Sequence, residues 1–375
     1  MTEKEIGELR RRMKPERTNI TAVRGCYVSS SGDVLSSFRQ SMGLMTEEDK
    51  EKYLAIFRKT LSGTVDRSLI DLPFRTAQVA DSEEHRLLMR LRESALNDDE
   101  AVETLFSRIR GAYTSEDHYL ILLAHENYDV PFKAKDGADL EDGSDVFSYV
   151  LCAVCPVKPS KEALRYVAEE KEFHNGSAGY AAAMPELGFL FPAFDGRRAN
   201  IYDCLYYTRS VKDNHEALVQ ALFNITPPLA AQQQQESFSG LLRETLEEAC
   251  SLPVVQAVRE DLRQRIEVHK ETKDDTPLTV SGAELRSVLA DAGVPEEKQA
   301  QFSVQFESTF GTDAALSPRN LMESKKIQLK TPDVIINVAP DRADLIETRV
   351  IGGIKYILIK ADDGVELSGV DLEIS

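Results

Sequence analysis

The chain of 375 residues contains no tryptophan, only five cysteines and no long hydrophobic run. The absence of tryptophan removes one of the side chains that most often anchors a binding surface. The longest apolar runs, Tyr119–Ala124 and Tyr149–Cys155, are far shorter than the ~20 residues of a membrane-spanning helix. The cysteines are scattered and odd in number, so they predict reduced thiols in the cytoplasm rather than a disulfide framework.

Positive charge is also scarce, because 45 Lys and Arg residues stand against 63 Asp and Glu residues and give a formal net charge of −18. That balance disfavours a general polyanion-binding protein, although a local basic patch remains compatible with it. The first residues, MTEKEIGELRRRMK, lack the apolar core of a signal peptide and predict a short helix instead. We therefore expect a soluble cytoplasmic protein that has no membrane partner.

Familiar catalytic and cofactor motifs are missing as well. The sequence has no P-loop, no GxGxxG turn after a strand, no HExxH helix, no EF-hand loop and no GxSxG motif. Cys152 and Cys155 form a CxxC pair, but no second pair or paired-histidine motif completes a set of four zinc ligands. The pair lies inside an apolar run typical of a strand, where residues three apart point to opposite faces. We expect buried structural thiols, no metal site and no cofactor.

Hydrophobic spacing divides the first 226 residues into helices and strands. Apolar residues at three- and four-residue steps predict helices over 2–13, 46–62 and 83–109, the last interrupted near 97–99. Two near-continuous hydrophobic runs, 118–127 and 146–157, predict strands buried on both faces. The remaining strands are predicted at 19–29, 32–42, 188–194 and 201–207. This part of the chain therefore predicts a central sheet of about six strands covered by helices.

The rest of the chain changes character twice. Pro227, Pro228 and the run Gln232–Gln235 mark a boundary by composition, and helical spacing follows. From 321 onward the segments are β-rich, with turns at Gly352-Gly353 and at 362–364, and predict one small antiparallel sheet. The predicted fold is mixed α+β in three parts, namely an N-terminal sheet domain at 1–226, a linker and helical region at 227–320 and a C-terminal β module at 321–375.

The segment Gly188–Thr208 combines aromatic and polar side chains more densely than any other window. Its adjacent arginines could bind a phosphate or carboxylate through forked hydrogen bonds, and its tyrosines could stack on a ligand or anchor a protein partner. The predicted binding residues here are Arg197, Arg198, Asn200, Tyr202 and Tyr206. The alternative is that the aromatic side chains pack in the core and the two arginines lie at a hairpin tip.

Two further groups of residues are candidates for a site. His125 lies near the end of a hydrophobic strand, and with Asp195 it is a weak candidate for acid–base chemistry, with Tyr128 as a binding residue beside it. The alternative is a histidine hydrogen-bonded at the edge of a core. The most basic local cluster contains Arg10, Arg11 and Arg12, together with Lys14, Arg17 and Arg24. It predicts contact with a nucleic-acid backbone or, alternatively, a solvated helix face.

Six blocks, taken in order, resemble a bacterial family described only as a domain of unknown function: CYVSSSGD, FRKTLSGTV, YLILLAHENYDVP, LCAVCPVKPSKEALRY, GFLFPAFDGRRANIYDCLYYT and TPDVIINVAPDRADLIETR. The resemblance extends over nearly the whole chain and implies a bacterial cytoplasmic protein without implying an activity. The layout is also similar to that of bacterial nucleoid-associated proteins of the 37-kilodalton class. In those proteins an apolar strand ends in a histidine and a tyrosine, as at His125 and Tyr128.

Three hypotheses about function follow from these features. The first is a non-catalytic interaction protein whose partner is a protein or a nucleic acid, with nucleoid association as its most concrete form. The second is an enzyme of hydrolase or phosphate-handling type, which requires His125, Asp195 and the adjacent arginines in one pocket. The third is a protein-binding scaffold that uses the C-terminal strands, for which an exposed apolar patch on IGGIKYILIK would be evidence. A homodimer is compatible with the acidic amphipathic helices.

Overall fold

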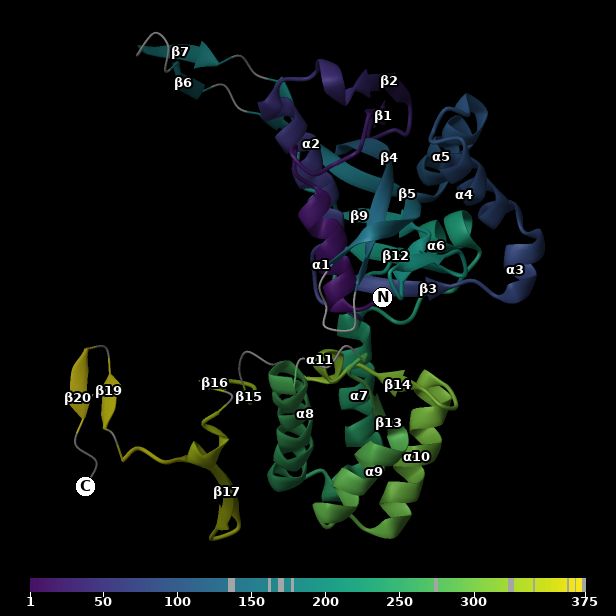
Figure 1. The fold of residues 1–375 in the computed structure, drawn as a ribbon. Coiled ribbons are helices and arrows are strands. Elements are labelled where there is room, and N and C mark those ends of the chain that lie inside the picture. The colour runs from purple at the N-terminus through teal and green to yellow at the C-terminus, as the bar shows by residue number, and fades with distance from the viewer. Residues whose placement is uncertain are drawn as a thin grey trace. The chain divides into compact units, whose positions relative to one another are not determined.

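A computed structural model of the chain describes residues 1–133, 139–160, 163–167, 172–176, 179–272, 276–322, 327–339, 341–362, 364–367 and 369–372. The chain forms two compact units, Met1–Ala230 and Ala231–Ser375, drawn in Figure 1. The division lies within the proline- and glutamine-rich stretch noted in the sequence. Among the described residues, no helix combines the length and the hydrophobicity that crossing a membrane requires.

The first unit is built around an antiparallel sheet of eight strands in the order β2-β1-β4-β5-β9-β12-β3, with β8 paired to β5. The strands are β1 Ala22–Val28, β2 Val34–Ser41, β3 Leu69–Pro73, β4 His118–Lys133, β5 Asp139–Ser160, β8 Gly179–Ala182, β9 Leu187–Phe191 and β12 Asp203–Thr208. The sequence predicted about six strands. The two additional strands, β3 and β8, have five and four residues, too few for a hydrophobic period to be visible.

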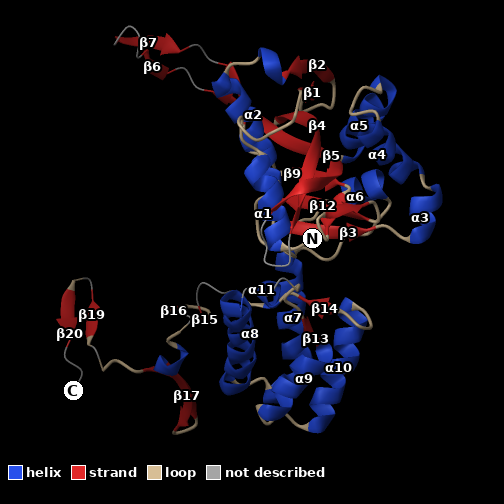
Figure 2. Ribbon diagram, in the orientation of Figure 1, coloured by secondary structure: helices blue, strands red, loops and turns tan. Residues whose placement is uncertain are grey.

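Helices cover both faces of this sheet (Figures 1 and 2). One face packs against α1 Glu3–Arg12 and α2 Glu47–Thr60, and the other against α4 Glu83–Glu93, α5 Asp99–Ala112 and α6 Glu216–Phe223. Because both faces are buried, alternate residues of β4 and β5 enter different cores and the strands are hydrophobic throughout, as predicted. The interrupted helix at 83–109 is indeed two helices, since the side chain of Asp98 caps α5 by accepting from the backbone N–H of Ala101.

Several short elements complete the first unit. They are the 3-10 turn η1 Met42–Leu44, the helix α3 Thr76–Asp81, and the hairpins β6 Ala163–Val167 with β7 Glu172–Gly176 and β10 Ala193–Asp195 with β11 Arg198–Asn200. The hairpin β10–β11 leaves the main sheet after β9 and carries Arg197 in its turn, at a φ of 60°. The predicted strand at 188–194 is therefore divided between two sheets.

The second unit begins with helices around a third hydrophobic core. They are α7 Ala231–Leu246, α8 Leu252–Thr272, α9 Gly282–Asp291, α10 Glu296–Phe310 and α11 Pro318–Leu321, with the turn η2 Glu247–Ala249 and the short pair β13 Val280–Ser281 and β14 Ala315–Leu316. Ser281 and Glu284 form the capping box that opens α9. Phe302 and Phe306, one turn apart on α10, provide the aromatic side chains that are fully buried in this core.

The C-terminal part differs from the single sheet that we predicted. Its strands pair as separate two-stranded hairpins, namely β15 Ile327–Lys330 with β16 Ile335–Val338, β17 Ile346–Ile351 with β18 Ile354–Ile359, and β19 Val365–Leu367 with β20 Val370–Leu372, with the turn η3 Ala343–Leu345 before β17. The predicted turn is present, because Gly352 and Gly353 both have positive φ, at 58° and 82°. The turns in the sequence thus predicted which neighbouring strands pair with each other, but they did not predict whether one hairpin pairs with the next.

Candidate functional site

The carboxylate of Glu126, on β4, is fully buried, with a side chain that is 0% exposed. Arg12 of α1 donates to its Oε1 atom from Nη2 at 2.6 Å and from Nε at 3.1 Å. The backbone N–H of Asn19 donates to the same oxygen at 2.7 Å, and the Tyr149 hydroxyl donates to Oε2. Both carboxylate oxygens are therefore occupied by the protein's own donors.

A second carboxylate, that of Glu8, lies one turn before Arg12 on α1 and binds two more of the predicted site residues. Arg197 donates to it from Nη2 at 2.8 Å and from Nε at 3.2 Å, in the forked geometry expected for arginine and a carboxylate. Tyr128 donates its hydroxyl proton to Glu8 at 2.6 Å, and the Arg12 guanidinium lies 4.1 Å from the centroid of the Tyr128 ring. Arg12, Tyr128 and Arg197, which are far apart in the sequence, thus meet in one network.

This network, which we call the α1 network (Glu8, Arg12, Glu126, Tyr128, Tyr149 and Arg197), fastens α1 to the sheet and to the β10–β11 turn. Arg197 also donates from Nη1 to the carbonyl oxygen of Pro131 at 2.8 Å. Burial raises the pKa of Tyr149 well above its ordinary value, and the charge of Glu126 raises that pKa further. For Arg12, burial alone would lower the pKa, but the hydrogen bond and charge of Glu126 outweigh burial and raise it. With these pKa directions Tyr149 stays protonated and Arg12 stays charged, so both continue to donate hydrogen bonds to Glu126. These bonds hold α1 against the sheet.

His125 is separate from this network. Residues alternate between faces along a strand, so His125 points to the face covered by α4 and α5, opposite to Glu126 and the α1 network. Its Nε2 atom forms a 2.9 Å hydrogen bond with the Ser148 hydroxyl. Burial lowers the pKa of His125, and the nearby charge of Arg92 lowers it further, which favours a neutral imidazole. Asp195 is exposed on β10, a strand that contacts α1, so the structure does not bring His125 and Asp195 into one pocket.

The other predicted residues of Gly188–Thr208 are dispersed. Tyr206 is 1% exposed in the core below α4–α6, and burial raises its pKa. Asn200 donates to Asp203 at 2.7 Å and to Asp195 at 3.3 Å, whereas Tyr202 is 45% exposed. Arg198 is 76% exposed in its side chain and lies 3.3 Å from Asp145. The burial of Tyr206 and the position of the two arginines at the β10–β11 turn fit the alternative that we gave for this segment, whereas the exposed side chain of Tyr202 does not.

The basic N-terminal cluster does not form one continuous surface. Arg10 and Arg11 are exposed on α1, while Arg12 is bound to Glu126. Arg24 of β1 pairs with Asp99 at 2.7 Å, and Asp99 belongs to α5 on the other face of the sheet. Nucleic-acid contact through Arg10 and Arg11 stays a prediction, without the support that a combined face with Arg24 and Arg197 would have provided.

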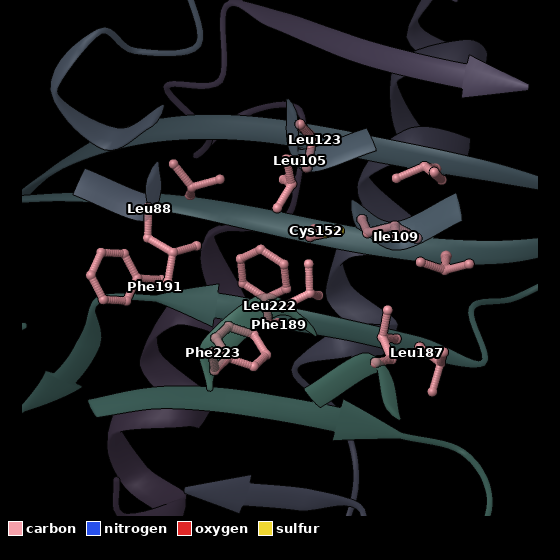
Figure 3. Close-up of a cluster of buried hydrophobic side chains, with 14 of the residues drawn as sticks. Leu88, Leu105, Ile109, Leu123, Cys152, Leu187, Phe189, Phe191, Leu222 and Phe223 are labelled. Carbon is pink, nitrogen blue, oxygen red and sulfur yellow. The ribbon is translucent and has the colours of Figure 1, made fainter. Parts of the chain in front are cut away.

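The cysteine pair has the arrangement that we expected. Cys152 and Cys155 are free and buried, and they lie in the cores on opposite faces of the sheet; Figure 3 shows Cys152 among Leu105, Leu123 and Phe189. Burial raises the pKa of Cys155 to about 12, so it stays a thiol at neutral pH. In the described part of the chain, no group of three or more His, Cys, Asp and Glu side chains is placed to hold a metal ion.

A surface of a different kind lies on the hairpin β17–β18, where large apolar side chains are exposed. The exposed fractions are 67% for Val350, 54% for Ile351, 60% for Ile354 and 53% for Ile359. Tyr356 and Ile357 are exposed to 40% and 37%. The sequence predicted these strands and identified the segment as a possible protein-binding surface, but it could not show whether other parts of the protein cover these side chains.

Comparison with known proteins identifies a family. The family model described as "Domain of unknown function (DUF4317)" matches residues 1–370, and the chain belongs to this family. No curated protein and no solved structure matches the chain. The resemblance drawn from the six sequence blocks is therefore confirmed, whereas the similarity to nucleoid-associated proteins stays a hypothesis based on layout.

Proposed function

We propose that this protein is a non-catalytic interaction protein that binds an extended, acidic segment of another protein along the hairpin β17–β18. The observation that supports this function most directly is the exposure of the apolar side chains on that hairpin. Several exposed apolar side chains on one short element are typical of interaction sites, whereas single exposed apolar residues are ordinary. The α1 network supports the non-catalytic part, because its arginines and carboxylates satisfy one another.

The register of the hairpin places apolar side chains on both of its faces. The cross-strand pairs Thr348–Ile357 and Ile346–Ile359 share one face, while Arg349–Tyr356 and Ile351–Ile354 share the other. An isolated two-stranded hairpin is marginally stable in water, since stability requires more strands or a covering layer. A partner strand added at an edge would provide the missing main-chain hydrogen bonds and cover part of the apolar surface.

Charge favours an acidic occupant. Between Ile346 and Lys360 the hairpin carries three basic residues, Arg349, Lys355 and Lys360, and one acidic residue, Glu347. Glu347 lies 2.8 Å from Arg349 and 3.5 Å from Lys360, whereas Lys355 lies opposite Val350 on the face that also carries Ile357 and Ile359. The hairpin is therefore locally positive, although the whole chain has a net charge of −18. A positive, apolar strand pair is complementary to an extended partner segment that alternates apolar and acidic side chains.

Site-specific photocrosslinking in the native host tests this function. A photoreactive amino acid at Ile357 should give one discrete product with another protein, and the crosslinked segment should alternate apolar and acidic residues. The matched control is Val304, which is 70% exposed on α10 and lies outside the hairpin. Ile354→Asp should abolish the product by repelling an acidic partner, whereas Ile354→Lys should weaken it less.

Other results would contradict the proposal. Equal crosslinking from Ile357 and Val304, or a partner segment without acidic residues, would exclude the proposed recognition. If the crosslinked product consists of two copies of this chain, the hairpin is a homodimer interface and the proposed partner is wrong. Sedimentation of the purified protein would then show a dimer.

We also place the protein in the cytoplasm. All five cysteines are free thiols, and four of them are buried, which suits a reducing compartment. Fractionation of the native host followed by immunodetection tests this localisation.

A further inference from the structure

A groove in the first unit lies between α2 and the strands β4 and β8, away from the α1 network. It encloses about 380 Å³. Its walls are formed by Tyr53 and Ile56 of α2, by Leu120 of β4, and by the segment Ala182, Ala183 and Met184. Met184 is 47% exposed at its rim. A volume of this size lies in the range of sites for small molecules and is too small for a folded protein partner.

An aromatic row crosses the strands beside this groove and consists of Tyr27 on β1, His118 on β4 and Tyr180 on β8. The rings of His118 and Tyr180 are stacked, with centroids 5.3 Å apart and planes 15° from parallel. The Tyr27 hydroxyl and the Nδ1 atom of His118 share a 3.1 Å hydrogen bond, which fixes the histidine ring from the other side. Tyr180 is 64% exposed, so one face of the stack is open to solvent.

The groove and the aromatic row form one continuous surface. Side chains two residues apart on a strand share a face, so His118 adjoins Leu120 and Tyr180 adjoins Ala182. Tyr27 lies directly opposite Leu120 in the β1–β4 register. Val157 of β5, which is 6% exposed, is paired with both His118 and Ala182 and forms the floor between them. An aromatic platform therefore leads into an apolar groove.

The charges at the rim indicate what this surface can hold. Lys52 and Asp49 of α2 both line the groove, and each is engaged on its own helix. Lys52 lies 3.2 Å from Glu48, and Asp49 accepts a 2.9 Å hydrogen bond from the N-cap hydroxyl of Thr46. A lysine that already lies beside a carboxylate, next to a second carboxylate, is a poor anchor for a phosphate or carboxylate. The apolar lining and the open tyrosine ring instead match an uncharged ring that stacks.

We propose that the groove and the aromatic row form a binding site for a small neutral molecule that carries a planar aromatic ring. The ring stacks on the open face of Tyr180, and an apolar substituent enters the groove between α2 and Ala182–Met184. This site is independent of the hairpin in the second unit.

Ligand-detected NMR titration of the full chain tests the site with two neutral probes, adenosine and N-acetyltryptophanamide. The probes represent nucleoside and amino-acid sources of the same ring chemistry, and their relative affinities distinguish those sources. Because the chain has no tryptophan, indole fluorescence of the second probe gives an independent titration without protein background. Tyr180→Ala should weaken binding by about tenfold or more, since stacking contributes that much at comparable sites, and Tyr180→Phe should retain most of it.

Two further variants separate a site from a general surface effect. Ala182→Leu fills the groove without touching the stack and should also weaken binding. Tyr202→Ala removes another exposed tyrosine of the same unit and should leave affinity unchanged. Adenosine monophosphate should bind more weakly than adenosine, because Lys52, the one cation among the described lining residues, already lies beside Glu48. Absence of saturable binding for both neutral probes, or binding that survives Tyr180→Ala, would overturn the proposal.

Discussion

The sheet of the first unit and the hairpin β17–β18 of the second use similar residues with opposite results. In β5, Val150, Leu151 and Val154 are each at most 2% exposed, whereas in β17–β18 Val350, Ile354 and Ile359 are each more than half exposed. The two regions differ in what surrounds their strands. β5 has a neighbouring strand on each side and helices on both faces of its sheet, whereas β17 and β18 form a two-stranded sheet in which each strand pairs with the other. Residue type therefore determines strand formation, and only neighbouring layers determine whether a strand is core or surface.

The largest expected effect is at the buried carboxylate of the first unit. Glu126→Ala leaves Arg12 and Tyr149 without their acceptor, and removing one partner of a buried ion pair typically costs about 3–5 kcal/mol. We expect a loss of that size in the free energy of unfolding. Tyrosine fluorescence during chemical denaturation reports this unit, because the chain has no tryptophan and only Tyr356 among its 12 tyrosines lies beyond Ala230. Glu48→Gln, at an exposed ion pair, is the control; an equal effect there would contradict the assignment.

The comparison of sheet and hairpin can be tested directly with matched truncations. Leu151→Ala, in a core of the first unit, should lower the free energy of unfolding by about 2–5 kcal/mol, because it creates a cavity. Ile357→Ala, on the hairpin, should change it by less than about 0.5 kcal/mol. Calorimetry of the full chain measures both. A large loss from Ile357→Ala would show that the hairpin is covered within the purified protein.

Two adjacent arginines provide an internal comparison of the same kind. Arg197→Ala removes the fork to Glu8 and the bond to Pro131, and should lower the free energy of unfolding by about 1–3 kcal/mol. Arg198→Ala should have an effect within about 0.5 kcal/mol, because its ion pair is exposed. Chemical denaturation followed by tyrosine fluorescence separates the two. If neither variant lost stability, Arg197 would again be a candidate for ligand binding.

The smallest expected effect is a change in pH dependence. Burial raises the pKa of Tyr128 to about 12, and its hydrogen bond to Glu8 raises it as well. The unfolded chain releases this proton at lower pH, near 10, so Tyr128 contributes stability below that pH and loses it as the pH rises toward 12. Between pH 10 and pH 12, the free energy of unfolding should fall less steeply with pH for Tyr128→Phe than for the unchanged protein. Denaturation curves recorded across this pH range measure that slope. Identical slopes would mean that Tyr128 is not held by Glu8.

Much of the fold could be predicted because it depends on local patterns. Continuous hydrophobic runs predicted β4 and β5, and apolar residues at three- and four-residue steps predicted α1 and α2. The strands β3 and β8 were missed because they are short, and β8 matters for function, since it carries Tyr180 and Ala182. The aromatic row could not be predicted because its three rings are more than sixty residues apart in sequence and are brought together by strand register.

The predicted binding residues show where sequence reasoning ends. Arg12, Tyr128 and Arg197 were predicted as binding residues, and the structure brings these three side chains together. Their partners, Glu8 and Glu126, gave no local signal, because a glutamate on a helix or a strand is usually solvated. Without those carboxylates the arginines look available to an external anion. With them, the same side chains hold a helix against a sheet.

The sequence by itself predicted the longer helices and strands of the first unit and the opposite orientation of Cys152 and Cys155, because these depend on residue periodicity, and its composition predicted a boundary near Pro227. Tertiary structure alone decided which charges are satisfied and which apolar side chains are covered. Both questions depend on contacts between residues distant in the chain, such as Arg12 with Glu126, or on layers that the hairpin β17–β18 lacks. Whether a side chain is buried depends on the residues that surround it in space. The sequence pattern predicts those neighbours only within a helix turn or a hairpin.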